Sequence, residues 1–332
     1  MAKIHYMFHR SLLLFIASIF LMGCPSSPEP SPKPPTPVDP ESSFNDYVDK
    51  GFIENEQLDE ASGLIASRKN PGFFWAHNDS NDANRLFFFD SNGKGKKEFY
   101  LANTTNRDWE DVSISTESDG SATVYVADFG DNNLLYKSYA IYWFKEPVVS
   151  PNGPLNNEIN DVKRVNFTLP DGGRDMECLM VDQKNKDIYL VSKREDLKRL
   201  YRISANNLKD GATVTAEFIS ELSFSNPFSS NTSVKELFYL TAGDISSDNQ
   251  EIIIRNYGYI YYWKLKSGES IPDALARQAK VVPSRSRYSS ADGLGEPQGE
   301  GLAFAADGSG YYSISESADM PGGIHFYYFK KK

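Results

Sequence analysis

Two short stretches of the sequence place acidic side chains in the same pattern ahead of an apolar run. They read NRDWEDVSI, at residues 106–114, and GRDMECLMV, at residues 173–181. Each contains Arg-Asp-x-Glu, and the glutamates are Glu110 and Glu177. Carboxylate oxygens bind hard cations or activate water when a fold brings several of them together. Further copies of the pattern are therefore expected, on elements that would bring the carboxylates together.

The pattern recurs and indicates five similar units. Aligning the apolar positions of five segments gives one shared register, held by Ser62, Glu110, Glu177, Gly243 and Glu300. Each segment is followed by a turn, a second strand-like run and an aromatic run such as YAIYWFK, and a fourth run follows in four of the units. This organisation predicts an all-β fold, a five-bladed β-propeller, over residues 43–332. Two packed β-sandwiches are the alternative.

The ends of this predicted domain complement each other. The fifth unit lacks a fourth strand, while the segment Phe44–Ile53 (FNDYVDKGFI) is a strand-like run without a partner ahead of the first unit. We expect this N-terminal strand to complete the last blade and close the ring.

The shared register predicts a site on the propeller axis. The first strand of each blade lines the central channel, so the five aligned residues would converge there. At about 5 Å and an effective dielectric near 20, each pair of like charges costs roughly 3 kcal/mol, which a bound cation would relieve. Carboxylate, hydroxyl and carbonyl oxygens favour Ca²⁺. A channel filled with water is the alternative.

A second group of charged residues is predicted at the rim of the same opening, because the second strands return to it. This group comprises His77, Asp79, Asp128, Lys193, Arg194, Arg255 and Glu316. The basic residues could bind an anionic ligand, and Asp79, Asp128 and Glu316 are candidate catalytic acids or bases. Ordinary surface salt bridges are the alternative.

The N-terminal region is predicted to direct the protein to the bacterial cell envelope. Residues 1–23 have a positive start and an apolar run of 12 residues, as in a signal peptide. The sequence LMGC resembles the lipobox of bacterial lipoproteins, which predicts lipidation of Cys24. Residues 24–42 are rich in proline and predict an extended stalk. The residue after Cys24 is Pro25, which fits sorting to the outer membrane.

The charge of the chain restricts its partners. The net charge is −10, and removing residues 1–23 would make it −12, which argues against binding to nucleic acid. The expected partners are a membrane, through the lipid on Cys24, and an anionic small molecule or other extracellular ligand. We expect a monomer. The motifs G-x-S-x-G, H-E-x-x-H and C-x-x-C do not occur in the sequence.

The motifs SGL, HNDS, NRDWED, GDNN and GEGLAF resemble those of an uncharacterised family of secreted bacterial β-propeller proteins, over most of the chain from Leu58 onward. The five-unit layout is more distantly similar to that of the calcium-activated nucleotidases, or apyrases. That resemblance implies an axial calcium ion, with ligands matching Ser62, Glu110, Glu177 and Glu300. The fourth unit differs, because Gly243–Asp244 stands where that family has serine. The resemblance also implies that Asp79 acts as a catalytic acid.

Three functions remain open from the sequence. The first is a lipid-anchored propeller that binds a ligand at its rim beside an axial calcium ion. The second is an apyrase-like, calcium-dependent hydrolase of phosphoesters or phosphoanhydrides. The third is a carbohydrate-processing propeller that uses paired carboxylates.

Overall fold

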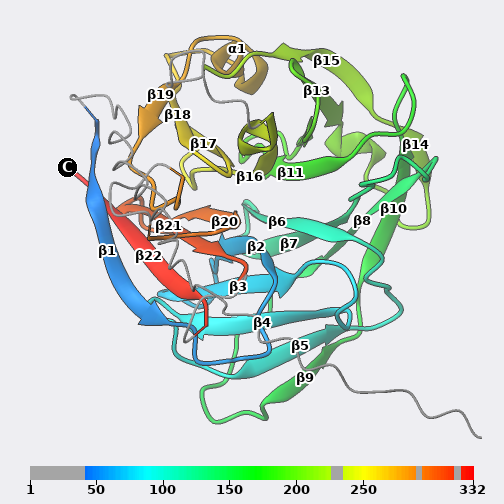
Figure 1. Ribbon diagram of the computed structural model, residues 1–332. Helices are drawn as coiled ribbons and strands as arrows, with labels where there is room; N and C mark the ends of the chain where they lie inside the picture. Colours follow the sequence, from blue (N-terminus) through cyan, green and yellow to red (C-terminus); the bar gives the residue numbers. More distant parts are fainter. Residues whose placement is uncertain (1–41, 226–234, 289–293, 318–322) are drawn as a thin grey trace, which may run out of the picture. The chain divides into compact units, whose positions relative to one another are not determined.

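The computed structural model describes residues 42–225, 235–288, 294–317 and 323–332. These residues form five sheets of four or five strands, and the first strands of all five lie around one centre (Figure 1). The predicted five-bladed propeller is therefore confirmed. The predicted signal peptide, residues 1–23, lies outside the described residues, as does nearly all of the predicted stalk, including Cys24. Among the described residues, no helix is long and apolar enough to cross a membrane.

Each blade runs from an inner strand at the channel to an outer strand at the edge. The inner strands are β2 (Ala61–Ala66), β6 (Trp109–Thr116), β11 (Met176–Val181), β16 (Leu240–Ile245) and β20 (Gly299–Phe304). The second strands are β3 (Phe73–Asn78), β7 (Ala122–Asp128), β12 (Ile188–Ser192), β17 (Glu251–Asn256) and β21 (Gly310–Ser315). The third strands are β4 (Arg85–Asp90), β8 (Tyr139–Lys145), β13 (Lys198–Ile203), β18 (Ile260–Lys264) and β22 (His325–Lys331). The fourth strands are β5 (Lys97–Leu101), β10 (Lys163–Thr168), β15 (Glu217–Leu222), β19 (Lys280–Val282) and β1 (Phe44–Phe52).

Two short strands extend the first and second blades. β9 (Asn156–Ile159) pairs parallel with β5, and β14 (Thr213–Thr215) pairs parallel with β10. The chain thus crosses from the second blade back to the first before it continues. Single turns complete the described structure: the 3₁₀ helices η1 (Ala205–Asn207) and η2 (Lys235–Phe238), and helix α1 (Ile271–Leu275), which Ser270 caps.

Apolar and aromatic side chains fill the space between blades. In the third strands, Phe87, Tyr142 and Tyr261 are at most 1% exposed, as the aromatic pattern of these strands predicts. Burial of each large apolar side chain stabilises the fold by about 1.5–3 kcal/mol. Buried carboxylates add polar links between blades. Asp244 of β16 accepts a hydrogen bond from the backbone N–H of Phe304 in the fifth blade, at 2.8 Å.

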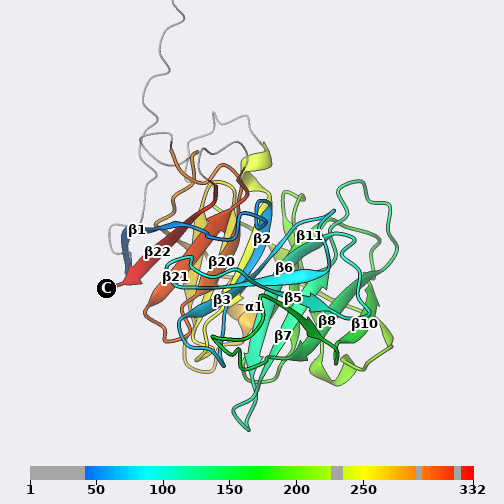
Figure 2. The ribbon, with the colours of Figure 1, turned by 90° about the horizontal axis from the view of Figure 1, so that it is seen from below.

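The ring closes through β1. β1 pairs antiparallel with β22, with Phe44 opposite Lys331 and Phe52 opposite His325, and both views place the two strands side by side (Figures 1 and 2). The Phe44 ring packs edge-on against Tyr262 of the fourth blade, at 5.3 Å between ring centroids. The predicted closure by the N-terminal strand is therefore confirmed.

Deleting residues 44–53 should open the ring and expose the unpaired edge of β22. An aromatic strand edge of this kind pairs readily with other chains. We expect the truncated protein to melt at a lower temperature and to form oligomers, which differential scanning fluorimetry and light scattering would detect. A truncated protein that stays monomeric with an unchanged melting temperature would show that β1 is not needed for closure.

Every inner strand carries a β-bulge one residue after its start. The bulged residues are Ser62, Glu110, Glu177, Thr241 and Glu300. The predicted register was thus correct in four blades and wrong in the fourth, where Thr241 takes the position assigned to Gly243. The slip is two residues, which keeps each side chain on the same face of its strand, so the apolar pattern cannot reveal it.

Candidate metal centre and its cavity

The bulges bring the three glutamates Glu110, Glu177 and Glu300 to one end of the channel. Each is at most 3% exposed. Two aspartates of the same motifs, Asp108 and Asp175, precede Glu110 and Glu177 by two residues and lie beside them. The repeated Arg-Asp-x-Glu pattern thus supplies two acidic positions per blade in the second and third blades. The prediction from the sequence included only the glutamates, although the repeated aspartate stands in the same motifs.

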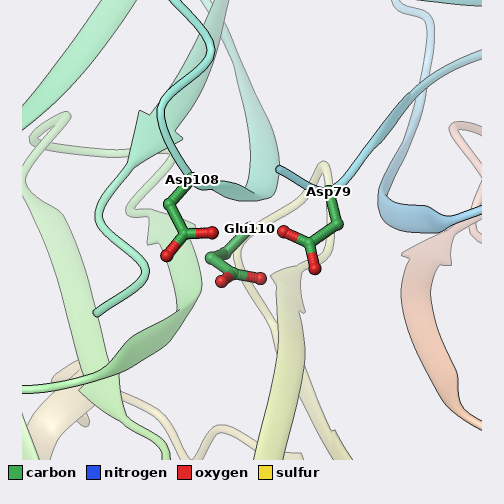
Figure 3. Close-up of side chains that lie close together, drawn as sticks. All are labelled: Asp79, Asp108 and Glu110. Atoms are coloured by element: carbon green, nitrogen blue, oxygen red, sulfur yellow. The ribbon is translucent and has the colours of Figure 1, made fainter. Parts of the chain in front are cut away.

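These carboxylates form two groups that share Glu110. One group is Asp79, Asp108 and Glu110, and the other is Glu110, Asp175 and Glu177; within each group, one oxygen per residue lies within 4.8 Å of the others. The carboxyl groups of Asp79, Asp108 and Glu110 are turned toward one another (Figure 3). Because calcium–oxygen bonds are about 2.4 Å long, a single ion can span oxygens up to about 4.8 Å apart. Either group could therefore hold a metal ion, and the all-oxygen ligands suit Ca²⁺ or Mg²⁺.

Protein cations neutralise only one of the two groups. The Lys193 ammonium forms an ion pair with Glu177, and the Arg194 guanidinium forms one with Asp175. Among the described residues, no ion pair involves Asp79, Asp108 or Glu110. The group of Asp79, Asp108 and Glu110, which we call the acidic triad, is therefore the one that lacks a cation.

Burial and neighbouring carboxylates raise the pKa values of all three carboxyl groups of the triad. Burial, followed by the negative charge of Asp79, raises the pKa of Asp108 to about 7. Burial and the charge of Glu177 raise the pKa of Glu110 well above its usual range. By contrast, the carboxylates around Lys193 hold the pKa of its ammonium well above normal, despite its burial. The pKa of Glu177 is also raised well above its usual range, because burial outweighs the opposing charge of Lys193. A divalent cation in the triad would lower the pKa values of its carboxyl groups.

The loop that follows β7 passes close to the carboxyl groups of the triad. Gly130 belongs to the GDNN motif, and a Cβ atom built there would lie 2.1 Å from Oε1 of Glu110 and 2.5 Å from Oδ2 of Asp108. Only glycine leaves room for both carboxylates at this point. The sequence signal for this role is the glycine two residues after the end of the second strand β7.

Two glutamate oxygens near the channel lack hydrogen-bond partners. Tyr257 donates from its hydroxyl to Oε1 of Glu300 at 2.8 Å, whereas Oε2 of Glu300 and Oε2 of Glu177 are buried without a partner among the described residues. Buried carboxylate oxygens are rarely left unsatisfied in stable proteins. A bound cation or ordered water would satisfy them, which fits an ion-binding channel mouth.

The remaining predicted ligands have other partners. The Ser62 hydroxyl donates to the backbone oxygen of Glu110 at 2.7 Å and lies 3.4 Å from its Oε2, so it lies against the triad. Thr241 donates in the same way to the backbone oxygen of Gly299, at 2.9 Å. Gly243 is in contact with the second and third blades instead: its N–H lies 3.4 Å from Asp111, and a Cβ there would be 2.6 Å from Sγ of Cys178.

A polar cavity of about 340 Å³ lies over the channel mouth. The described residues that line it are Asp79, Asn132, Lys193, Arg194, Glu236, Leu237, Tyr239, Tyr257, Tyr288, Gln298, Glu300 and Glu316. Four predicted rim residues therefore share one cavity: Asp79, Lys193, Arg194 and Glu316. Burial and the charge of Glu300 raise the pKa of Glu316 to about 8, so this carboxyl group holds a proton at neutral pH. Tyr239 and Tyr257, which the sequence analysis did not single out, complete the wall.

The other three predicted rim residues do not line this cavity. His77 is fully buried, and burial lowers its pKa to about 4. Asp128 accepts a hydrogen bond from the N–H of Asp108 at 3.0 Å and so supports the triad from behind. Arg255 is 1% exposed and pairs with Glu296 at 2.7 Å. The predicted placement of Arg255 at the rim was wrong, and the cause is the same two-residue shift in the fourth blade. The position in that blade that is equivalent to Lys193 is Tyr257.

The chain is distantly similar to several solved structures. No protein-family model and no curated protein sequence matches the chain. Among solved structures, a luciferin-regenerating enzyme is 11% identical and covers 86% of this chain and 95% of its own, with a TM-score of 0.43. The PQQ-bound aldose sugar dehydrogenase from Streptomyces coelicolor is 10% identical and covers 86% and 98%, also with a TM-score of 0.43. These similarities are too low to indicate a function.

Proposed function

We propose that this protein binds a calcium ion in the acidic triad and, with it, a small phosphate-bearing ligand in the cavity above. The observation that carries the proposal is the position of Asp79, which belongs both to the triad and to the cavity wall. A ligand in the cavity would therefore lie beside the ion. Calcium is favoured because the ligands are carboxylate oxygens from two segments, the end of β3 and the start of β6, and this ion accepts irregular oxygen shells.

The charges explain why the ligand would need the metal. The cavity and the two acidic groups together contain eight carboxyl groups: Asp79, Asp108, Glu110, Asp175, Glu177, Glu236, Glu300 and Glu316. The two basic residues of the cavity, Lys193 and Arg194, are already paired with Glu177 and Asp175. Without a metal, a phosphate would meet net repulsion. With calcium in place, the ion and the two basic side chains can contact phosphate oxygens together.

Isothermal titration with adenosine monophosphate tests this dependence. We expect binding in the presence of calcium and none after chelation, whereas adenosine, which lacks the phosphate, should bind in neither condition. By reciprocity, the nucleotide should tighten calcium binding by the same factor. Asp79→Asn should abolish both effects, whereas Asp59→Asn, in a carboxylate outside the triad and the cavity, should preserve them. Equal binding of nucleotide with and without calcium would refute the proposal.

Hydrolysis of the bound phosphate is a second candidate function. Asp79 would lie beside both the ion and the ligand, and Glu316 holds a proton that it could donate to a leaving group. The test is the release of inorganic phosphate from ATP and ADP with and without calcium. If both nucleotides bind but remain intact, the protein is a binding module.

The location of this activity is also part of the proposal. Anchored by a lipid on Cys24, the propeller would act in the bacterial cell envelope, at the outer membrane. Loss of fatty-acid labelling in Cys24→Ser would support this, and labelling that persists in the variant would overturn it.

A further inference from the structure

A second cavity lies at the outer edge of the first blade, formed by other residues than the channel mouth. Its volume is about 570 Å³, and its described lining is Lys69, Asn70, Pro71, Phe73, Phe88, Gly95, Lys96, Lys97, Val149, Pro151, Gly153 and Leu155. Phe73 and Phe88 stack on each other with ring centroids 4.8 Å apart and nearly parallel planes. Both the size and the mainly apolar wall are typical of sites for small organic molecules.

The cavity exists because the chain crosses over it. Residues 146–155 connect β8 of the second blade to β9, which pairs with β5 of the first. Asn70 holds the start of this crossover, since its side chain accepts from the N–H of Val149 at 2.8 Å and donates to the carbonyl of Pro147 at 3.0 Å. Lys97 holds the far end by donating to the carbonyl of Gly153 at 2.6 Å.

The crossover is stiff between these two attachments. It contains Pro147, Pro151 and Pro154, whose rings fix the backbone φ angle. The turn at 150–153 is closed by a hydrogen bond from the N–H of Gly153 to the carbonyl of Ser150, at 3.1 Å. The crossover is therefore held beside the Phe73 and Phe88 rings before any ligand binds, which lowers the entropic cost of binding.

The charges around this cavity differ from those of the rest of the molecule. The chain carries a net charge of −10, yet three lysines line the cavity, and none of the described lining residues is acidic. The Lys69 ammonium donates to a neutral carbonyl, that of Gly120, at 3.2 Å. Lys96 is exposed. Leu155, the last residue of the crossover before β9, is 60% exposed, so apolar surface is left open to solvent beside these cations.

We propose that this cavity binds an amphipathic carboxylate, a small molecule with an apolar body and one anionic head group. The body would lie against Phe73, Phe88 and Leu155, and the carboxylate would face the ammonium groups of Lys69 and Lys96. This binding requires neither calcium nor the acidic triad, so it is independent of the function proposed above.

Isothermal titration with decanoate, below its micellar concentration and in the presence of chelator, tests the inference. Decanol and decyltrimethylammonium have the same chain with a neutral or a positive head group. We expect decanoate to bind about tenfold more tightly than decanol, a difference in line with two exposed ion pairs, and the cation to bind most weakly. If the three compounds bind equally, or if none binds, the inference is wrong.

Two pairs of variants locate the binding. Leu155→Asp should weaken decanoate binding at least tenfold, whereas Val148→Asp, at an exposed residue of the same crossover that does not line the cavity, should not. Lys69→Gln combined with Lys96→Gln should remove the preference for decanoate over decanol, and Lys94→Gln, in the same hairpin but outside the lining, should retain it. All five positions are at the surface or at its edge, so the variants should fold. Equal effects within a pair would place the binding elsewhere.

Discussion

Calcium is expected to raise the free energy of unfolding by about 2.7 kcal/mol at a concentration 100 times its dissociation constant. The reason is that the three carboxylates of the triad meet only in the closed ring, so the unfolded chain offers no comparable site. Thermal melts of chelated protein with and without added calcium would measure the shift. Magnesium should give a smaller shift, because it demands near-octahedral geometry and shorter bonds, whereas calcium accepts irregular oxygen shells.

Glu110→Gln should remove most of this shift, because Glu110 belongs to both acidic groups. In the absence of calcium, the variant should be at least as stable as the wild type, since one of three repelling carboxyl groups becomes neutral. Glu316→Gln is the matched control, because Glu316 lines the cavity but lies outside both groups, and it should preserve most of the shift. A wild-type protein with no calcium-dependent shift would rule out the metal centre.

Glu177→Gln should behave in the opposite way. Sequence reasoning placed Glu177 among mutually repelling glutamates, but the structure pairs it with the buried Lys193. The glutamine variant leaves this ammonium without its charged partner, so it should destabilise the protein with or without calcium, by up to about 3–5 kcal/mol. Thermal denaturation of Glu110→Gln and Glu177→Gln under the same conditions would distinguish a carboxylate that binds the metal from one that is paired with a protein cation.

The same experiments should depend on pH. The pKa of Asp108 is raised from 3.8 to about 7 in the folded protein, so between these values the folded state holds more protons than the unfolded chain. Stability without calcium should therefore fall as pH rises through this window. Calcium must displace these protons, so its stabilising effect should grow over the same range. A calcium shift that is constant from about pH 5 to about pH 8 would argue against the triad as the site.

Arg255→Leu is expected to have the largest effect on stability, a loss of about 3–5 kcal/mol. Arg255 and Glu296 are each 1% exposed, and their side chains meet at 2.7 Å. Arg255 also donates to the backbone carbonyl of Gly301 at 3.1 Å, which links the fourth blade to the fifth. Removing the arginine leaves a buried, uncompensated carboxylate. Urea denaturation of the variant would measure the loss.

A double variant separates the charge effect from a general packing defect. Arg255→Leu combined with Glu296→Leu removes both charges and should be more stable than either single variant. If the losses of the two single variants simply add, the pair is not an energetic unit. Glu296 lies two residues before Gln298 of the cavity wall, so Arg255→Leu should also weaken nucleotide binding.

The sequence was sufficient to predict the propeller because each blade repeats the same order of apolar runs and turns. It was also sufficient to place Glu110, Glu177 and Glu300, since a bulge recurs at each of them. It failed in the fourth blade, where Thr241 and Gly243 lie on the same face of one strand and only the position of the bulge distinguishes them. A bulge is a feature of the pairing between two strands, and one strand's pattern does not record it.

The ion-pair partners of the charged residues could not be predicted from the sequence either. Lys193 and Glu177 are 16 residues apart, and their pairing follows from the way β12 returns beside β11. Arg255 was predicted at the rim because it is a charged residue near the end of a second strand. Its burial depends on the ion pair with Glu296, which follows a long connection between blades. Charge type and spacing therefore predicted where carboxylates gather, but not which of them already have a cation.

The closure of the ring by β1 has a consequence for how the chain can fold. β1 is the first strand of the domain in chain order, yet its partner β22 is the last, and Asn45 and Lys330, which share a hydrogen bond, are 285 residues apart. A contact between such distant residues forms late, because closing so long a loop costs entropy that only the completed blades can offset. During synthesis, β1 must therefore stay unpaired until the final strand is available. Over that interval its apolar residues need protection, and dependence on a chaperone should be strongest for chains that stop just short of β22.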